Sequence, residues 1–301
     1  MELADRLEER SSLALGPPLG IVPIMPILAV SSQVSVGHVG NAAAVPAFER
    51  LGHEVWRIDT VAFSNHPGHH QFTGRVRPDH EIAELLRGVG EHTGWAGLNG
   101  IYSGYLGEAN TGRVLATALD AVRRAAPDAV YACDPVIGDH GRVFVREGVE
   151  NAIRDELVPR AQIITPNAFE LSRLSGHRVE TVGDAHAAAV TLLEWGPGVV
   201  VGTGIPDGGH LAVVLVTPDL NLIARSPWRD RPFFGTGDLF TALFLAHYLP
   251  ARDPAAALTK AVAGLEVATA ATEMAGTKDL ALIASLDAIV GAAPVAVSPL
   301  G

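Results

Sequence analysis

Short, almost continuously apolar runs alternate with helical segments along most of this chain. The apolar runs predict strands at residues 26–31, 53–59, 97–102, 128–133, 161–165, 198–203, 211–217 and 220–225. The segments between and after these runs predict helices at about 41–51, 79–90, 109–125, 147–157, 168–175, 183–195, 238–249, 254–273 and 279–291. This alternation is typical of an α/β fold, in which helices cover both faces of a mostly parallel sheet. We therefore predict a three-layer sandwich.

The two runs at 211–217 and 220–225 are separated only by Pro218 and Asp219. This short connection predicts an antiparallel hairpin near one edge of the sheet. No internal repeat and no linker interrupts the pattern. Residues 1–25 show little periodicity and contain a Gly-Pro-Pro break. We therefore expect a poorly structured N-terminal extension, residues 1–25, followed by one domain, residues 26–301.

The charge and composition exclude several classes of function. Among 301 residues, 48% are hydrophobic and the net charge is −11 without a basic block, which disfavours binding to nucleic acid or to an anionic membrane surface. The single cysteine, Cys133, excludes an intrachain disulfide, and we interpret it as a small buried residue rather than a nucleophile. The acidic N-terminus lacks the features of a secretory signal, so we expect a cytoplasmic protein.

The chain also lacks the sequence motifs of two common nucleotide-binding layouts. Lys260 and Lys278 are the only lysines, and no GxxxxGK[ST] motif occurs, which removes P-loop nucleotide binding. The VAIK-type lysine and the HRD motif of protein kinases are also absent from the sequence.

Polar segments follow the predicted strands, among them "SSQVSVGHVGN" (31–41), "SGY" (103–105), "DPVIGD" (134–139) and "TPNAFE" (165–170). In an open α/β sheet, ligands bind beyond the carboxyl ends of the strands. The pattern predicts a ligand site at this edge of the sheet, although ordinary turns are polar as well.

The segment "GTGD" at 235–238 combines two features that conflict at first sight. Gly235, Thr236 and Gly237 lead into a helix, and backbone N–H groups at a helix start attract anions. Asp238 would repel a permanently bound phosphate. The two fit together if a phosphoryl group is transferred there and Asp238 accepts the proton of the attacking hydroxyl. The alternatives are an N-cap role for Asp238, or a fragment of a dinucleotide-binding motif that is incomplete at Phe240.

The segments "CDPVIGD" and "TPNAFEL" carry candidate ligands for a metal ion and for a nucleotide. Asp134, Asp139 and Glu170 offer the hard carboxylate oxygens that Mg²⁺ prefers. Thr165 and Asn167 offer a hydroxyl and an amide before a helix. The alternative is structural: an ordinary strand-to-helix cap, with Glu170 as a first-turn acid.

The segment "SNHPGHHQFTG" at 64–74 predicts a polar loop over the site, with the character of a lid that excludes water. Its histidines, His66, His69 and His70, lack the partners and spacing typical of a zinc site, which leaves zinc as a weak alternative.

These segments together resemble the pyridoxal kinases of the ribokinase-like superfamily. The matching segments are "ILAVSSQVSVGHVGNAAAVPAFERLG", "TVAFSNHPGHHQFTG", "YSGYLG", "CDPVIGD", "IITPNAFEL" and "GTGDLF", which span about residues 27–250. The resemblance implies a ribokinase-like fold and ATP-dependent phosphorylation of the 5′-hydroxymethyl group of pyridoxal. It also implies Mg²⁺, a monovalent cation such as K⁺, and a homodimer.

The resemblance implies a role for individual residues of this chain. It makes Asp238 the base and the backbone of Gly235, Thr236 and Gly237 the anion hole. It assigns the pyridine ring to Ser32, Phe63, His66 and Tyr105, the nucleotide to Asp134, Thr165, Asn167 and Thr203, and the metal to Asp139 and Glu170. Three residues depart from the family pattern: Gln33, Pro67 and Phe234, which replace a histidine, a hydroxyl residue and a valine. They bear on substrate choice more than on phosphoryl transfer.

Three alternatives remain open at this stage. The nearest is another ribokinase-like small-molecule kinase, such as a hydroxymethylpyrimidine kinase. The second is a non-catalytic protein that binds B6 vitamers. The third, an NAD-dependent dehydrogenase, is disfavoured because the sequence contains no complete GxGxxG.

Overall fold

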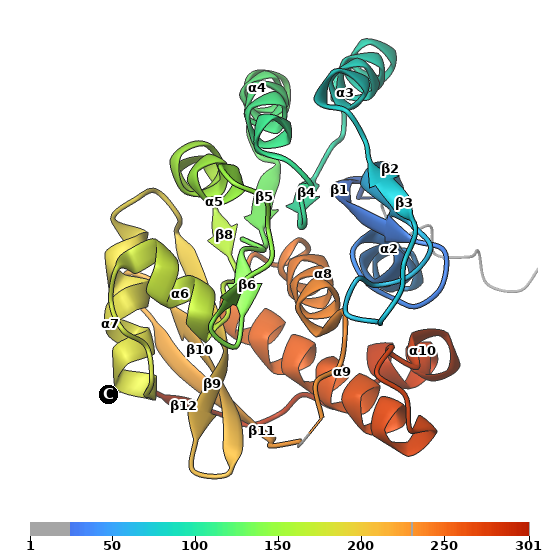
Figure 1. Ribbon diagram of the computed structural model, residues 1–301. Helices are drawn as coiled ribbons and strands as arrows, with labels where there is room; N and C mark the ends of the chain where they lie inside the picture. The colour runs from blue at the N-terminus through green and yellow to red at the C-terminus, as the bar shows by residue number, and fades with distance from the viewer. Residues whose placement is uncertain (1–24, 230, 301) are drawn as a thin grey trace, which may run out of the picture.

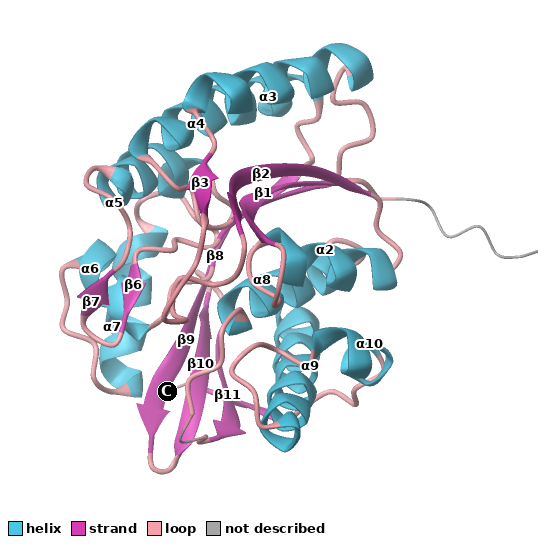
Figure 2. Cartoon of the chain, turned by 45° about the vertical axis from the view of Figure 1, so that its right-hand side comes forward, coloured by secondary structure: helices cyan, strands magenta, loops and turns pink. Residues whose placement is uncertain are grey.

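A ten-stranded sheet forms the middle layer of the computed structural model, which describes residues 25–229 and 231–300 (Figures 1 and 2). The strand order is β12-β11-β10-β9-β8-β5-β4-β1-β2-β3. The strands are β1 (Ile27–Val34), β2 (Val55–Phe63), β3 (Gly74–Val76), β4 (Gly100–Ser103), β5 (Val130–Cys133), β8 (Ile163–Ile164), β9 (Val199–Asp207), β10 (His210–Val216), β11 (Asn221–Pro227) and β12 (Val297–Pro299). A separate small hairpin joins β6 (Gly138–Asp139) to β7 (Arg142–Val143).

The central strands, from β9 through β8, β5, β4 and β1 to β2, are all parallel. The predicted hairpin is confirmed, because β10 and β11 pair antiparallel. The antiparallel edge is wider than predicted, since β10 also pairs antiparallel with β9, and β12 with β11. Strands β3, β6, β7 and β12 were not predicted, because two or three residues are too few to show a periodicity.

Helices cover both faces of the sheet, which confirms the predicted three layers (Figure 1). One face carries α3 (Asp79–Thr93), α4 (Ala109–Ala125), α5 (Val149–Ala152), α6 (Ala168–Ser175) and α7 (Val182–Leu193). The other carries α2 (Asn41–Arg50), α8 (Thr236–Tyr248), α9 (Pro254–Ala275) and α10 (Leu282–Val290). Within β1, Leu28 and Val30 enter the first core and Ile27 and Ala29 the second, as expected of a strand buried on both sides.

Two helix starts and one helix interior differ from the prediction. The segment predicted as one helix at 147–157 is α5 followed by a π-helical turn, Ile153–Leu157, and a 3₁₀ turn, Val158–Arg160. The last helix begins at Leu282 instead of 279, because residue 279 belongs to a segment that contacts the site. Helix α8 begins at Thr236, two residues before the predicted start.

The order of the sheet reverses between β1 and β4. From β1 the chain continues to β2 on one side, whereas β4, β5, β8 and β9 follow on the other side. Such a switch point opens a crevice beyond the carboxyl ends of the strands, where ligands bind in open α/β sheets. The predicted extension, residues 1–25, lies outside the described residues except for Met25. Among the described residues, no helix is long and apolar enough to cross a membrane.

Candidate active site

Helix α8 begins at the switch point with its first backbone N–H groups free of any side-chain cap. Its N-cap is Gly235, whose φ of +85° is unfavourable for other residues. A Cβ atom on Gly235 would also lie 2.0 Å from the His38 carbonyl oxygen. The glycine therefore lets the loop after β1 approach the helix start closely. The uncapped N–H groups and the helix dipole together make an anion-binding position.

Asp238 is the third residue of α8, so the N-cap interpretation of this aspartate is wrong. Its Oδ1 atom accepts a hydrogen bond from the Tyr102 hydroxyl at 2.8 Å. Burial raises the pKa of the Asp238 carboxyl, whereas the Gly40 backbone N–H and the Tyr102 hydroxyl favour the ionised form and lower that pKa. The carboxylate therefore lies between the helix start and the end of β4, where a substrate hydroxyl can meet it.

A second carboxylate, Asp134, lies close to Asp238 at the end of β5. Its side chain is buried, and its Oδ2 atom would lie 3.5 Å from a Cβ atom on Gly237. Burial raises the pKa of Asp134 well above its usual range, and the charges of Glu170 and Asp238 raise it further. Two neighbouring negative charges and burial therefore disfavour the ionised form of Asp134, and a cation bound next to this carboxylate would stabilise that form.

Glu170 belongs to a complete capping box at the start of α6. Asn167 accepts a hydrogen bond from the Glu170 N–H, and Glu170 Oε2 accepts one from the Asn167 N–H, both at 2.9 Å. Glu170 Oε1 accepts from Ile137 N–H at 2.9 Å and from Gly138 N–H at 3.4 Å. The structure therefore contains the strand-to-helix cap that was the alternative interpretation of Asn167 and Glu170. Burial raises the pKa of Glu170 to about 8, against the effect of these N–H groups.

The remaining residues assigned to the nucleotide and metal gather around this capping box. Asn167 pairs with Thr203 in an isolated parallel bridge, and its amide donates to the Gly138 carbonyl at 2.9 Å. Asp139 follows directly in β6 and is half-buried. Thr165 lies deeper, where its hydroxyl contacts the Thr241 hydroxyl of α8 at 2.7 Å. These residues lie in β6, directly after β8, and within β9.

The residues assigned to the pyridine ring come from the other side of the crevice. Ser32 is buried where the β1–β2 register shifts, and a Cβ atom on Gly40 would lie 2.2 Å from the Ser32 hydroxyl oxygen. Phe63 ends β2, and its ring meets that of Phe72 at 5.1 Å between centroids. Tyr105 follows β4, is half-buried, and has a pKa raised by burial.

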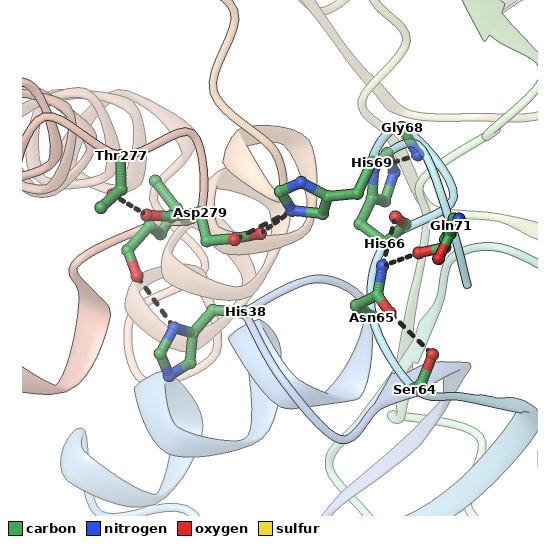
Figure 3. A network of polar contacts seen from close by, with 10 residues as sticks. His38, Ser64, Asn65, His66, Gly68, His69, Gln71, Thr277 and Asp279 are labelled. Atoms are coloured by element: carbon green, nitrogen blue, oxygen red, sulfur yellow. Dashed lines mark hydrogen bonds and ion pairs between the residues drawn. The ribbon is translucent and has the colours of Figure 1, made fainter. Parts of the chain in front are cut away.

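The loop at residues 64–73, here called the lip, lies beside the segment before α10 (Figure 3). The His66 ring lies on the ring of Phe234, with centroids 4.1 Å apart and planes inclined by 31°. His66 Nδ1 accepts the Gly68 N–H, and burial lowers the pKa of His66, so a neutral ring carries its proton on Nε2. His69 Nε2 contacts the Asp279 carboxylate at 3.0 Å, which attaches the loop to the segment before α10.

Two of the departures from the family pattern have a local explanation. Pro67 occupies the second position of a turn closed by the His69 N–H and the His66 carbonyl, a position that proline favours. Phe234 supplies the ring on which His66 lies and bridges to Asp279. Gln33 donates to the neighbouring Val34 carbonyl, which explains nothing about substrate choice.

Two of the three histidines of the lip contact neighbouring residues: His66 contacts Phe234, and His69 contacts Asp279. In the part of the chain that the structure describes, no three histidine, cysteine or acidic side chains form a metal-binding group. Cys133 is buried, and burial raises the pKa of its thiol to about 12, which confirms the interpretation as a small buried residue.

Two site residues were missed from the sequence. Tyr102 appeared as the end of an apolar strand and the first residue of "YSGYLG" without a role, and Asp279 only as the start of a helix. The available signal for Tyr102 was its place in a buried strand, since a buried tyrosine hydroxyl usually has a hydrogen-bond partner. Asp279 gave no comparable signal.

The structure has the ribokinase-like fold of a small-molecule kinase. Two features point to this class: the three-layer sandwich, and a glycine-led helix start without a side-chain cap that lies beside a carboxylate at the switch point. A family model described as phosphomethylpyrimidine kinase matches residues 96–281. The chain is 38% identical over 270 residues to pyridoxal kinase PdxY of Rubrobacter xylanophilus, covering 88% of this chain and 93% of that protein. It is 40% identical over 278 residues to PdxY of Deinococcus radiodurans, with 88% and 93% covered.

Solved structures agree with these relatives. The pyridoxal kinase of Leishmania donovani in complex with ADP and pyridoxamine matches with a TM-score of 0.86 and 30% identity, over 92% of this chain and 99% of that one. The chain belongs to the pyridoxal kinase family.

Proposed function

We propose that this chain transfers the γ-phosphoryl group of ATP to the 5′-hydroxymethyl group of pyridoxal, with Asp238 as the base. The observation that carries the proposal is the Asp238 carboxylate beside an uncapped helix start at the switch point. The related kinases named above, and the Leishmania enzyme solved with ADP and B6 vitamers, support the choice of both substrates.

The proposed step is an in-line phosphoryl transfer. The substrate hydroxyl oxygen forms the new bond to phosphorus, the bond from phosphorus to the β-γ bridging oxygen breaks, and ADP leaves. Asp238 accepts the hydroxyl proton. The backbone N–H groups of Gly235, Thr236 and Gly237 stabilise the charge that spreads over the transferring group.

The crevice offers groups of suitable chemistry for the pyridine ring. Phe63 and Tyr105 offer aromatic surfaces, and the Ser32 hydroxyl offers a polar contact. Neutral His66 offers an Nε2 donor, and its ring is already held by Phe234. Because Phe234 and Pro67 shape this side of the crevice, they are the residues with which a difference in vitamer preference should be tested.

The donor set fits magnesium bound together with ATP phosphates. Mg²⁺ in kinases is held by one or two carboxylates, and water and phosphate complete its shell. Asp134 offers a buried carboxylate. Asp139 would have to give up its hydrogen bond from the His140 N–H or its contact with the His140 ring, and Glu170 a backbone hydrogen bond, to coordinate directly. Bound there, Mg²⁺ would neutralise phosphate charge during transfer. The requirement for K⁺ and the homodimer are inferred from the resemblance, and sedimentation equilibrium tests the dimer.

The test is a substrate panel with the purified protein, Mg-ATP and K⁺. Pyridoxal, pyridoxine, pyridoxamine and hydroxymethylpyrimidine are compared, with ADP release as the common readout and absorbance for pyridoxal phosphate. Product from pyridoxal supports the proposal. Turnover of the pyrimidine alone would show that the protein is a kinase with a substrate other than pyridoxal. The match to the phosphomethylpyrimidine kinase family model is the observation that favours this second candidate. Binding of B6 vitamers without any ADP release would favour a binding protein.

A further inference from the structure

The hydroxyl group of Tyr102 contacts Asp238, the proposed catalytic base, although the ring of Tyr102 is packed in the core. It lies on β4, is fully buried, and its ring meets Phe48 of α2 edge-on at 6.0 Å between centroids. Its hydroxyl reaches Asp238 Oδ1 at 2.8 Å, across 136 positions of sequence. The contact joins the central sheet to the first turn of α8.

The direction of this hydrogen bond is fixed by the charges around it. Burial raises the pKa of Tyr102 well above its usual range, and the charges of Asp238 and Asp134 raise it further. Tyr102 therefore keeps its proton at any pH at which the protein works. A phenol has one proton, so Tyr102 donates and the Asp238 carboxylate accepts.

The chain after β4 closes over the pair and limits its movement. A Cβ atom on Gly104 would lie 2.7 Å from the Tyr102 hydroxyl oxygen and 3.3 Å from Asp238 Oδ1. The terminal torsion of an aspartate is otherwise broad, so the carboxylate by itself has no preferred orientation. The Gly40 backbone N–H and the Tyr102 hydroxyl, whose ring is packed in the core, are the donors that select an orientation.

We propose that Tyr102 is a positioning residue for phosphoryl transfer: its hydroxyl holds Oδ1 of Asp238 and thereby presents Oδ2 to the substrate hydroxyl. The inference rests on the proposed function, because it concerns the same base. Its effect falls on the chemical step, since neither substrate needs to touch Tyr102 in order to bind. A charged hydrogen bond of this kind predicts that its loss lowers kcat about 10-fold to 100-fold.

The decisive comparison is Tyr102→Phe against Tyr131→Phe. Tyr131 lies on the adjacent strand β5, is equally buried, and its hydroxyl bonds to Ser103 at 2.7 Å on the opposite face of the sheet. Both variants lose one buried hydroxyl, so both should lose some thermal stability. Only Tyr102→Phe should lower kcat, and its KM values for pyridoxal and ATP should stay within about three-fold of wild type.

A double-mutant cycle with Asp238→Asn separates positioning from a merely structural role. If Tyr102 acts through Asp238, adding Tyr102→Phe to Asp238→Asn should lower kcat by less than about two-fold more. Equal losses in both backgrounds would overturn the inference, as would an unchanged kcat in the single variant. Tyr102→Phe keeps the ring and removes only the hydroxyl, and its thermal unfolding midpoint sets the assay temperature at which wild type and variants are compared while folded.

Failure of the proposed function is distinguishable in the same assay. A wild type that phosphorylates another alcohol in place of pyridoxal removes the proposed substrate, and the cycle is then run with that alcohol. A wild type that phosphorylates nothing overturns both proposals. An active wild type with an unaffected Tyr102→Phe variant overturns only the inference about Tyr102.

Discussion

Helices α6 and α8 both begin with an acidic residue in the first turn, but this residue makes different contacts in the two helices. Each carries an acidic residue at its third position, Glu170 in α6 and Asp238 in α8. In α6 the acid turns back to its own N-cap and completes a reciprocal capping box with Asn167. In α8 the N-cap is Gly235, which has no side chain, and Asp238 turns toward the sheet, where it meets Tyr102 of β4.

This difference shows that the residue at the cap decides whether a helix start is closed or available. A side-chain oxygen at the N-cap satisfies backbone N–H groups within the protein and leaves them nothing to offer a ligand. A glycine leaves those groups for a ligand and lets a neighbouring loop approach. The acid at the third position then serves stability in one helix and, as we propose, proton transfer in the other.

The largest effect on activity is expected from neutralising Asp238, the acidic residue in the first turn of α8. Asp238→Asn should lower kcat by about 10²-fold to 10⁴-fold, the usual range for loss of a general base, and should leave the fold intact. The measurement is steady-state formation of pyridoxal phosphate, with thermal unfolding as the control for folding. Turnover close to wild type would show that Asp238 is not the base.

Glu170, at the start of α6, should make the stability of the protein depend on pH. The pKa of Glu170 is raised from 4.5 to about 8 on folding, so between these values the folded state holds a proton that the unfolded state has lost. The free energy of unfolding should therefore fall as pH rises from 5 to 8, by at most ~1.4 kcal/mol per pH unit for this group.

Urea unfolding of the metal-free and nucleotide-free protein at several pH values measures this slope. Glu170→Gln is the matched variant, because it cannot titrate, and it should show a smaller slope whatever its absolute stability. Equal slopes in the two proteins would mean that the three backbone N–H groups keep Glu170 ionised throughout.

Removing a cap should separate its structural role from its proposed role at the nucleotide. Asn167→Ala should lower the free energy of unfolding by about 0.5–2 kcal/mol, the range for loss of an N-cap. Thr181→Ala removes the cap of the equivalent box in α7, and should have a similar effect on stability. Only Asn167→Ala should also raise the KM for ATP, and an unchanged KM would leave Asn167 as a cap alone.

The smallest effect is expected from loosening the loop at residues 64–73, which tests whether substrate binding beside α8 depends on this loop. Asp279→Asn weakens the contact with His69, and a partly exposed pair of this kind is worth about 0.2–1 kcal/mol. The KM for pyridoxal should therefore rise about two-fold to five-fold. Asp287→Asn, which removes the exposed pair with Arg50, is the control. Equal KM values in both variants would show that the lip closes without this contact.

Local signals predicted most of the fold, because helices and strands follow periodicities and turn chemistry, whereas the family resemblance assigned most of the site residues. The helices at 41–50, 109–125 and 168–175 lie where the sequence placed them, and so does the β10–β11 hairpin. The short strands and the start of α8 were missed, since two-residue strands and a glycine N-cap leave no periodic pattern. The roles assigned to the individual site residues stay predictions until the variants are measured.

The amino-acid sequence by itself determined the three layers, the parallel middle of the sheet, the glycine-led helix start and the acid behind it. These features follow from patterns within a few turns of chain. The capping box of Glu170 joins residues only three positions apart, whereas only the tertiary structure decided that Asp238 meets Tyr102. It also decided that a histidine loop is attached to residue 279. These contacts join residues 136 and 210 positions apart, and no local pattern specifies which distant groups a folded sheet brings together.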